Sequence, residues 1–383
     1  MKILVLSHSF PTTKTIDFVF VDQLCRAFAD LGHQVTVVAP QSITRCILRH
    51  VPIVRCHSYY ETANGNTIEL YRPYYISLGK SGIKIFQGGF SKAVQRVCRR
   101  IKTKPDVCYG HFWQCIHTLY PIAKENGIPL YGASGEEDVA LYVRTSRQFN
   151  DEVCQYLSGI VSVSTKNQQE CLSFGLITPD KSVVIPNAID QSLFRKLDKA
   201  ECRQKLGLSQ EDFIVAFVGQ FVPRKGTLRI NEALKKLNDA KIKAVFIGSG
   251  PEEPDYASIV HKGRVAHDDV SVWLNAADVF VLPTENEGCC NAIVEAMACG
   301  LPVVSTDASF NYDILNENNS IMVDCHDVDA IAAAISKLKN NPDLTQRLSK
   351  GALAVAEGLS ITKRAERIIE FMQKQIAITK KNN

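Results

Sequence analysis

Short apolar runs alternate with helical patterns along most of the chain. The run at residues 3–6 predicts a buried strand, and Val21, Leu24 and Phe28 then recur at helical spacing before a second strand at residues 34–39. This alternation favours βαβ units, in which parallel sheets are covered by helices on both faces. The same pattern predicts further strands of this series at residues 107–109, 130–131, 160–163 and 183–185.

A second series of strands and helices follows residues 186–195, where Pro and Asn indicate a linker. We therefore expect an N-terminal domain at residues 1–187 and a C-terminal domain at residues 188–358. Residues 359–383 should add a last helix, whose apolar face packs back on the N-terminal domain. The second series comprises strands at 213–218, 244–247, 279–282, 303–305 and 321–323, and helices at 226–237, 270–276, 291–299 and 330–338.

Composition is that of a globular protein: 45% of the 383 residues are hydrophobic, 22% are charged, and mean hydropathy is −0.05. No apolar stretch reaches the ~18 residues of a membrane-spanning helix. The first ten residues end without the cleavage site of a signal peptide. Thirteen cysteines without framework spacing indicate free thiols in a reducing compartment. We expect a cytoplasmic protein.

Positive charge is concentrated at residues 45–104, which hold 12 Lys and Arg against two acids, Glu61 and Glu69. Such a segment suits nucleic acid, anionic lipid headgroups or a phosphorylated acceptor, although a solvated basic face is an equal alternative. The chain after residue 187 is net acidic and shows no recognition module, so we expect no nucleic-acid partner. Peripheral contact with an anionic membrane, at the inner face of the cytoplasmic membrane, stays open.

The densest signal is LPTENEGCCNAIVEAMACGLPVVST at residues 282–306. It runs from a strand end through a polar loop into a helix, and ligands of open α/β sheets bind at such loops. Glu287 lies in the loop and Glu295 eight residues later, roughly 12 Å along a helix axis, so the two carboxylates would serve different parts of one long ligand. The amides from Gly288 to Asn291 could hold a phosphate at the helix N-terminus. Taken alone, this spacing also arises by chance.

Other motifs occur in a consistent order along the chain. They are GHQVTVVAP at 32–40, SVVIPNAIDQSLF at 182–194, FVGQFVPRKG at 217–226, IGSGP at 247–251, and the PT-x-x-E-G loop with its E-A-M-A-C-G-L-P-V-V continuation. Together they closely resemble the nucleotide-sugar glycosyltransferases of the GT-B fold, family 4, which retain anomeric configuration. The resemblance spans nearly the whole chain. It implies two Rossmann-like doubly wound domains that face each other across a cleft, with a C-terminal helix that packs back.

The resemblance implies a donor site in the second domain. Arg224 and Lys225, beside Gly219, would neutralise the donor diphosphate as it becomes the leaving group. Glu295 would accept hydrogen bonds from the ribose, and Glu287 would contact the sugar near its reacting carbon.

Two further residues complete that implied donor site. Asn291, with the amides that begin at Gly288, would hold phosphate or sugar. His267 lies where the family contacts the nucleobase, but the run from His267 to Asp269 fits helix capping equally well.

The acceptor side is less well defined. His111 resembles the histidine at the end of an H-x-H strand, which faces acceptor or donor sugar, and its alternative is a structural role. The chain departs from the family twice: residues 11–17 lack glycine, and SGEE at 134–137 replaces a His-Gly pair. Glu136 or Glu137 is then the candidate to take the place of the missing histidine.

No metal or cofactor is expected besides the nucleotide sugar. The chain has no G-x-x-x-x-G-K-[ST] and no G-x-G-x-x-G motif. Asp327 and Asp329 precede a helical pattern, which fits capping better than metal binding. The spacings of five other potential ligands fit no standard zinc site: Cys98, Cys108, His111, Cys115 and His117.

We therefore expect retaining transfer of a sugar to a hydroxyl of a glycan or lipid-linked glycan, in cell-envelope or exopolysaccharide synthesis. The departing phosphate would take the acceptor proton, so no dedicated base is needed. Two alternatives stay open: a nucleotide-sugar 2-epimerase of the same architecture, and a catalytically silent protein that only binds the nucleotide sugar.

Overall fold

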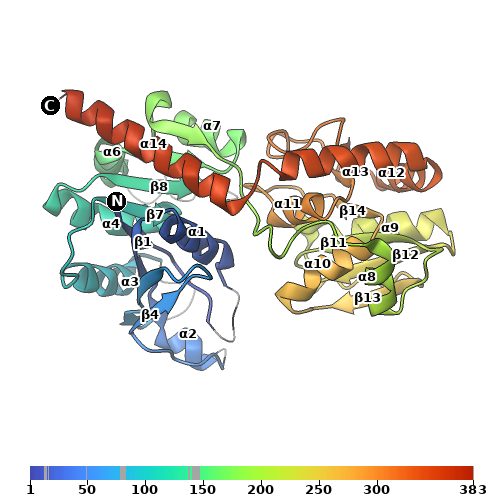
Figure 1. The fold of residues 1–383 in the computed structure, drawn as a ribbon, viewed down its shortest axis with the longest axis horizontal. Helices are drawn as coiled ribbons and strands as arrows, with labels where there is room; N and C mark the ends of the chain where they lie inside the picture. Colours follow the sequence, from blue (N-terminus) through green and yellow to red (C-terminus); the bar gives the residue numbers. More distant parts are fainter. Residues whose placement is uncertain are drawn as a thin grey trace. The chain divides into compact units, whose positions relative to one another are not determined.

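The computed structural model describes residues 1–12, 15, 17–48, 50–77, 83–136, 139 and 147–382. The chain divides into two compact units, unit 1 (Met1–Ile185 and Ile361–Asn383) and unit 2 (Pro186–Ser360). Each unit is an α/β structure, with helices on both sides of a mainly parallel sheet (Figure 1). The predicted class, two α/β domains with mainly parallel sheets, is thus confirmed.

In the described part of unit 1, eight strands form one sheet in the order β10-β9-β8-β7-β1-β2-β5-β4. All neighbours are parallel except β4 and β5, which form an antiparallel hairpin. The bounds are β1 Lys2–Leu6, β2 Gln34–Val38, β4 His57–Glu61, β5 Thr67–Tyr71, β7 Val107–His111, β8 Leu130–Ser134, β9 Gly159–Ser162 and β10 Ser182–Val184, with a separate parallel pair, β3 Gln41–Ser42 and β6 Tyr74–Tyr75.

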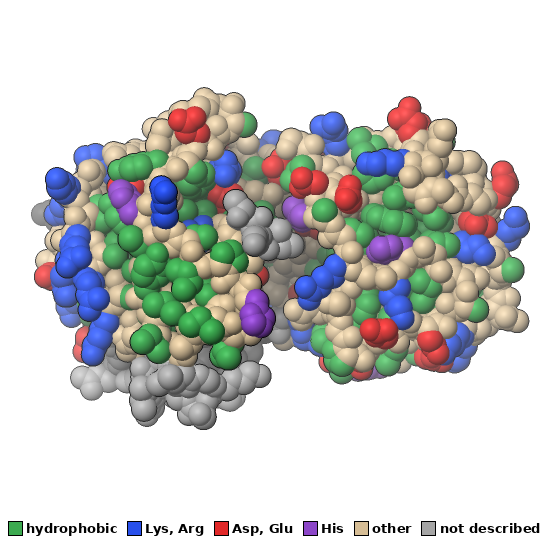
Figure 2. Space-filling view, turned by 90° about the horizontal axis from the view of Figure 1, so that it is seen from below, with side chains coloured by type: hydrophobic (Ala, Val, Ile, Leu, Met, Phe, Trp, Pro, Cys, Tyr) green, Lys and Arg blue, Asp and Glu red, His purple; other side chains and the backbone are tan. Residues whose placement is uncertain are grey.

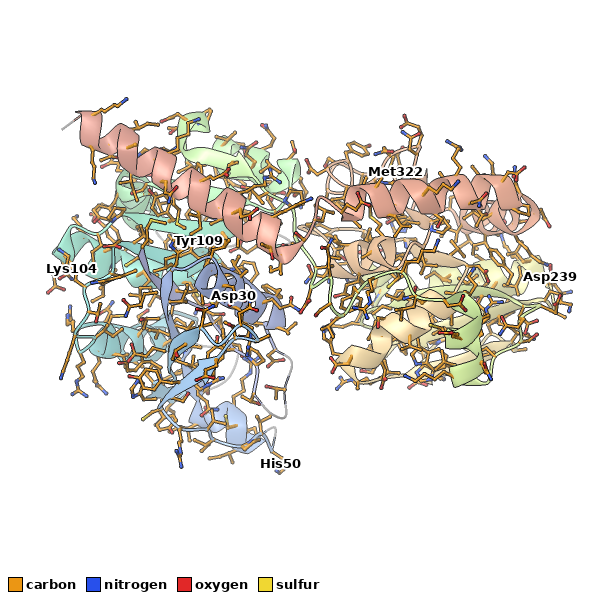
Figure 3. All side chains as sticks on the ribbon, viewed as in Figure 1. Asp30, His50, Lys104, Tyr109, Asp239 and Met322 are labelled. Atoms are coloured by element: carbon orange, nitrogen blue, oxygen red, sulfur yellow. The ribbon has the colours of Figure 1, made fainter. Side chains whose placement is uncertain are left out.

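Alternating side chains of the unit 1 strands feed two cores, one on each face of the sheet. Ile3 and Val5 join the core under α1 and α14, whereas Leu4 and Leu6 join the core under α3 and α4. Tyr109, labelled in Figure 3, belongs to the first core. The helices are α1 Val19–Asp30, α2 Ile43–Leu48, α3 Ile83–Cys98, α4 Trp113–Asn126, α6 Arg147–Tyr156, α7 Thr165–Ser173, the short η1 Pro179–Lys181 and α14 Ile361–Asn382.

The last helix, α14, packs against α1 on the sheet of unit 1 (Figure 1, red). Ala365, Ile368 and Met372 of α14 are fully buried in the same core as α1. The backbone carbonyl of Met372 also accepts a 3.2 Å hydrogen bond from the hydroxyl of Tyr131 on β8. The C-terminal segment therefore completes the hydrophobic core of unit 1.

In unit 2, the six strands of the sheet are all parallel, in the order β13-β12-β11-β14-β15-β16. Their carboxyl ends lie at one edge, where the loops that follow β11, β12 and β14 gather. The strands are β11 Phe213–Val218, β12 Ile242–Ile247, β13 Ile259–Gly263, β14 Val279–Leu282, β15 Val303–Thr306 and β16 Ser320–Val323. The helices are α8 Lys199–Leu206, η2 Pro223–Lys225, α9 Thr227–Leu237, α10 His267–Ala276, α11 Asn291–Ala298, α12 Val328–Asn340 and α13 Pro342–Ala356.

Candidate donor and acceptor sites

Two loops of unit 2 meet at the carboxyl end of β14. Gly226, which follows η2, has φ +74°, and a Cβ there would lie 2.6 Å from the carbonyl oxygen of Pro283. Only glycine therefore lets the loop after β11 approach the loop after β14 this closely. The contact is closed by a 2.9 Å hydrogen bond from the amide of Glu285 to the carbonyl of Arg224.

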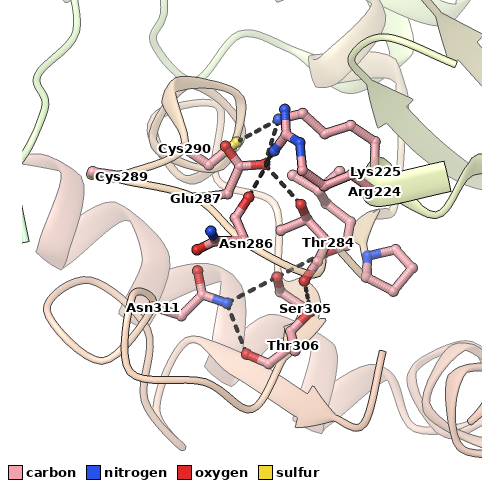
Figure 4. Close-up of polar contacts among 12 residues, drawn as sticks. Arg224, Lys225, Thr284, Asn286, Glu287, Cys289, Cys290, Ser305, Thr306 and Asn311 are labelled. Atoms are coloured by element: carbon pink, nitrogen blue, oxygen red, sulfur yellow. Dashed lines mark hydrogen bonds and ion pairs between the residues drawn. The ribbon is translucent and has the colours of Figure 1, made fainter. Parts of the chain in front are cut away.

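Glu287 is the centre of the resulting polar cluster (Figure 4). Its Oε1 atom accepts hydrogen bonds from Lys225 Nζ at 2.6 Å, from Arg224 Nη1 at 2.8 Å and from the hydroxyl of Thr284 at 2.8 Å. Arg224 Nη1 also donates to the carbonyl of Asn286 at 2.7 Å. The structure thus brings together three of the predicted residues, although more than 60 positions separate Arg224 and Lys225 from Glu287.

The cluster favours the charged form of Lys225. Burial alone would lower the pKa of Lys225, but Cys290 and Glu287 outweigh it, so the pKa lies above its usual value. Cys290 Sγ lies 4.0 Å from Lys225 Nζ, and burial raises the pKa of this thiol. Two permanent cations therefore share one carboxylate, which leaves net positive charge where an anion could replace Glu287.

The helix α11 starts next to this cluster. Its first residue, Asn291, has a buried Oδ1 atom without a hydrogen-bond partner among the described residues, and the first amides of a helix are free donors. One turn further on, the carboxylate of Glu295 also lacks a hydrogen-bond or ion-pair partner within the described chain. Burial raises the pKa of Glu295 to about 7. Glu287 and Glu295 thus have different environments: three donors contact Oε1 of Glu287, whereas the described chain offers no donor to Glu295.

Two further predicted donor residues lie on neighbouring elements of unit 2. Gly219 follows β11, and its carbonyl oxygen would be 1.8 Å from a Cβ at Gly248, so the two loops are in close contact. His267 is the first residue of α10 and its ring packs 5.4 Å from that of Phe194. The N-cap position belongs to Ala266, which has no side chain able to cap, so the capping alternative for His267 and its neighbours is wrong. In contrast, Asp327 caps α12 as predicted.

In unit 1, His111 ends β7 and is 4% exposed. Its Nδ1 atom is buried without a hydrogen-bond partner among the residues that the structure describes. Burial, with a smaller contribution from Arg364, lowers the pKa of His111 to about 3. The ring lies 4.7 Å from that of Phe112 and 5.3 Å from that of Phe20. His111 is therefore a neutral hydrogen-bonding group at neutral pH.

Glu136 fixes the turn that follows His111. Its Oε1 accepts the amide of Trp113 at 2.7 Å, and its Oε2 accepts the amide of Gly135 and the hydroxyl of Ser134. Phe112, between His111 and Trp113, has φ +74° and ψ 157°, a conformation that costs about 1–3 kcal/mol outside glycine. Burial raises the pKa of Glu136 despite these bonds. Glu137, the other candidate here, lies outside the described residues.

A hollow of about 200 Å³ lies near the carboxyl ends of β1 and β2 in unit 1. His8, Gln41, Arg45 and Tyr75 are among the residues that line it. Within the residues described, no three His, Cys, Asp or Glu side chains gather as a metal site requires. All thirteen cysteines are free thiols.

Sequence reasoning missed three residues that shape these sites: Thr284, Asn286 and Phe112. Thr284 belongs to the quoted PT-x-x-E-G loop, three positions before Glu287, and that motif could have indicated it. Arg224 donates to the backbone carbonyl of Asn286, and any residue type at position 286 would offer that carbonyl. The sequence therefore could not indicate this contact. The strain at Phe112 is a backbone property that residue type does not reveal.

Comparisons with known proteins agree with this architecture. The model of the Glycosyltransferase Family 4 matches residues 18–193, and that of the Glycosyl transferases group 1 matches residues 198–355. Sucrose-phosphate synthase from Thermosynechococcus elongatus shares the fold at a TM-score of 0.78 and 17% identity, over 99% of this chain and 100% of that one. HepE from Anabaena in complex with UDP-glucose gives a TM-score of 0.71 and 18% identity, over 98% and 100%.

Two of the similar curated proteins are also named as glycosyltransferases. A "putative teichuronic acid biosynthesis glycosyltransferase", TuaC of Bacillus subtilis, is 27% identical over 89% of this chain and 90% of its own. The "UDP-Gal:alpha-D-GlcNAc-diphosphoundecaprenol alpha-1,3-galactosyltransferase" of Escherichia coli is 28% identical over 55% and 58%.

Fold and family models define the class as a glycosyltransferase of the GT-B fold. The chain belongs to glycosyltransferase family 4, whose members are retaining enzymes that use nucleotide sugars. This finding favours sugar transfer over the epimerase alternative.

Proposed function

We propose that residues 188–358 bind the nucleoside diphosphate sugar, and that residues 1–187, completed by residues 359–383, bind the acceptor. The observation that carries the proposal is the convergence of Arg224 and Lys225 on Glu287 beside the start of α11. Two cations and a helix N-terminus form a site for a dianionic diphosphate.

On donor binding, the diphosphate replaces Glu287 as the partner of Arg224 and Lys225. These preorganised cations then stabilise the negative charge that develops on the leaving group, so no metal is needed. Asn291 and the amides from Gly288 hold phosphate or sugar, and Gly219 leaves room for the close approach of the backbone. The free carboxylate of Glu295 accepts hydrogen bonds from the ribose, and His267 lies beside the nucleobase.

Transfer proceeds with retention because attack and departure occur on the same face of the sugar. The acceptor oxygen bonds to the anomeric carbon as the bond to the diphosphate oxygen breaks, and the departing phosphate takes the acceptor proton. Glu287, released from the cations, faces the positive charge that develops at that carbon. His111 stays neutral and orients the sugar by hydrogen bonding through its free Nδ1.

The acceptor is a hydroxyl of a glycan or of a lipid-linked glycan, used in cell-envelope or exopolysaccharide synthesis. Support comes from relatives whose names specify teichuronic acid biosynthesis and a diphosphoundecaprenol-linked substrate. The hollow near β1 and β2 is the candidate acceptor site, and Arg45 offers it a positive charge. Glu136 acts here as a positioning residue for the turn after His111, and Glu137 stays a candidate from the sequence alone.

We further propose that unit 1 makes peripheral contact with the anionic inner face of the cytoplasmic membrane. No helix in the described part of the chain combines the length and apolar character needed to cross a bilayer. Figure 2 shows hydrophobic side chains spread over the face of unit 1 that carries α2, where Leu48 is 80% and Ile47 63% exposed. A column of basic side chains follows one edge of unit 1, the edge at which Figure 3 labels Lys104.

Cosedimentation with anionic vesicles tests the membrane contact. Binding should fall as salt is raised, because basic side chains contribute, and should be lost in Leu48→Glu. Leu228→Glu, at an exposed leucine of α9 in unit 2, is the matched control. If neither salt nor Leu48→Glu changes the fraction of protein that cosediments with the vesicles, this proposal is refuted.

Thermal unfolding with UDP, GDP, ADP, CDP and NAD at matched concentrations tests the donor site. One nucleoside diphosphate should raise the unfolding midpoint selectively, because a ligand that binds only the folded state stabilises it. The increase should be lost in Lys225→Ala and kept in Lys235→Ala, an exposed lysine of α9. Nucleotide binding without transfer or hydrolysis of any derived sugar would favour the silent binding protein, and no binding at all would refute the donor site.

A further inference from the structure

At one edge of the unit 1 sheet, the strands β5 and β4 leave one of their faces open. On β5, Ile68 and Leu70 are buried toward α1, whereas Thr67, Glu69 and Tyr71 point to the other side and are at least partly exposed. His57 and Tyr59 of β4 lie directly opposite Tyr71 and Glu69. This open face lines a hollow of about 570 Å³, which extends to Arg100 and Lys102 after α3.

The side chains of this face are held in place by one carboxylate. Glu69 Oε1 lies 3.0 Å from His57 Nε2 and accepts the hydroxyl hydrogens of Tyr59 at 3.1 Å and Tyr71 at 2.7 Å. The imidazole of His57 stacks on the ring of Tyr71, with centroids 4.4 Å apart, and meets Tyr59 edge-on at 5.0 Å. Tyr59 is nevertheless 62% exposed. An exposed ring with a fixed hydroxyl loses little conformational entropy when a ligand stacks on it.

The rim of the hollow is positive. Among the described residues, Arg100 and Lys102 have no ion-pair partner, whereas the adjacent Arg99 pairs with Glu125. The single carboxylate in the lining, Glu69, already accepts three hydrogen bonds on Oε1 and one from Thr36 on Oε2, which spreads its charge. The hollow therefore suits an anionic ligand with flat, partly apolar faces and many hydroxyl groups.

The hollow is separate from the sites described above. It reaches Gln34 at the start of β2, whereas His111 ends β7 at the opposite, carboxyl edge of the sheet. Three strand spacings separate β7 from β5 in the sheet order, roughly 14 Å. The hollow also shares no lining residue with the acceptor hollow near β1 and β2, so a long chain molecule could occupy it without entering the acceptor hollow.

We propose that this hollow binds a segment of an anionic glycan, with Tyr59 as stacking platform and with Arg100 and Lys102 as partners of its acidic groups. Sugar rings offer apolar faces to Tyr59 and hydroxyls to Thr67, Gln34 and Glu69. The proposal takes from the proposed function only that the acceptor is a glycan. Such a site would hold a growing polymer between successive transfers.

Calorimetric titration of the full chain with a galacturonate hexamer, maltohexaose and a uridine hexanucleotide tests the proposal. The galacturonate hexamer should bind, with an affinity that falls as salt rises, and maltohexaose should bind more weakly. Tyr59→Ala should weaken binding about tenfold, which corresponds to about 1.4 kcal/mol. The double variant Arg100→Gln, Lys102→Gln should weaken it by at least as much.

Two control variants distinguish loss of the Tyr59 ring from an effect on the fold. Tyr59→Phe keeps the ring without its bond to Glu69 and should bind within about twofold of the unchanged protein. Tyr312→Ala removes a 56% exposed tyrosine of unit 2 whose hydroxyl donates to Asp307, and should change nothing. If Tyr59→Ala does not fold, the double variant at the exposed residues Arg100 and Lys102 still tests the proposal.

Three results would overturn the proposal. They are no binding of the galacturonate hexamer, binding by Tyr59→Ala and by the double variant that is as tight as binding by the unchanged protein, or tighter binding of the uridine hexanucleotide. Titration of the same variants with UDP keeps the two questions apart. Loss of UDP binding in the unchanged protein would refute the donor site but leave the glycan site standing. Absence of glycan binding while UDP still binds would refute the glycan site but leave the donor site unaffected.

Discussion

Lys225 Nζ lies 2.6 Å from Glu287 Oε1, and Arg224 shares that same oxygen at 2.8 Å. Glu287 is 7% exposed, so this is a buried carboxylate that two cations hold in place. The arrangement neutralises the cations only in part. In the proposed function, this cluster is the anion site, and the donor diphosphate replaces Glu287 as the partner of the two cations.

Glu287→Gln should separate nucleotide binding from transfer. The amide removes the negative charge that competes with a diphosphate, so UDP affinity should stay equal or rise. Transfer from the nucleotide sugar should fall by about 100-fold, because charge opposite the reacting carbon is lost. Glu285→Gln is the control, since Glu285 lies in the same loop but pairs with Arg229. Equal transfer rates of the two variants would show that Glu287 has no catalytic role.

The two ion pairs of Asp278 test whether a buried cation contributes more to stability than an exposed one. Asp278 accepts a 2.7 Å bond from Arg203, whose side chain is 3% exposed, and another from Lys199, whose side chain is 48% exposed. Arg203→Gln should lower the free energy of unfolding by about 3–5 kcal/mol, because it leaves a poorly solvated carboxylate. Lys199→Gln should cost about 1 kcal/mol or less. Urea unfolding measures both, and similar losses would contradict the assigned burial.

The strands that sequence patterns predicted are all present, because buried parallel strands are short continuous apolar runs. The patterns missed β4 and β5, whose exposed face carries His57, Tyr59, Glu69 and Tyr71, so no continuous apolar run exists there. The edge strand β13 was missed for the same reason, since only alternate positions are partly covered.

The residues proposed for the donor site could be selected from the sequence because they lie in local sequence motifs, but their contacts could not be predicted. The bonds from Arg224 and Lys225 to Glu287 depend on how two loops pack, which Gly226 permits. On the acceptor side, Glu136 was expected to face a ligand, yet its carboxylate oxygens accept bonds from Ser134, Gly135 and Trp113. A buried carboxylate near a helix start has two possible partners, ligand or backbone, and residue type does not distinguish them.

Glu295 should make stability and nucleotide binding depend on pH in opposite directions. Its pKa rises from 4.5 to about 7 on folding, so the folded state favours the protonated form. The resulting stabilisation is complete below about pH 4.5 and is lost as pH rises toward 7. Relative to Glu295→Gln, the unchanged protein should therefore lose unfolding free energy over this interval.

Binding should show the opposite trend, because only the carboxylate form accepts two ribose hydrogen bonds. UDP affinity should rise between pH 6 and 8, through the pKa of about 7. Glu295→Gln should bind more weakly at pH 8 and lose this dependence. Titrations at several pH values, with the same variant as reference, measure the effect. An equal pH dependence in both proteins would place the titrating group elsewhere.

Gly226→Ala should disrupt the donor site through the backbone alone. The new Cβ meets the carbonyl of Pro283 at 2.6 Å in a residue with φ +74°, so the two loops must separate. Gly207→Ala is a matched control, because Gly207 in the same unit has φ +67° but nothing within 4 Å of an added Cβ. Both variants should lose about 1 kcal/mol of stability from the left-handed conformation.

The difference between these two variants measures the loop contact itself. Gly226→Ala should lose a further 1–3 kcal/mol, roughly the cost of overpacking, and its UDP affinity should fall because Arg224 and Lys225 move away from α11. Gly207→Ala should bind UDP normally. Thermal unfolding with and without UDP gives both quantities in one experiment. If the two alanine variants lose equal stability and bind UDP equally, the close approach of the two loops does not position the cations.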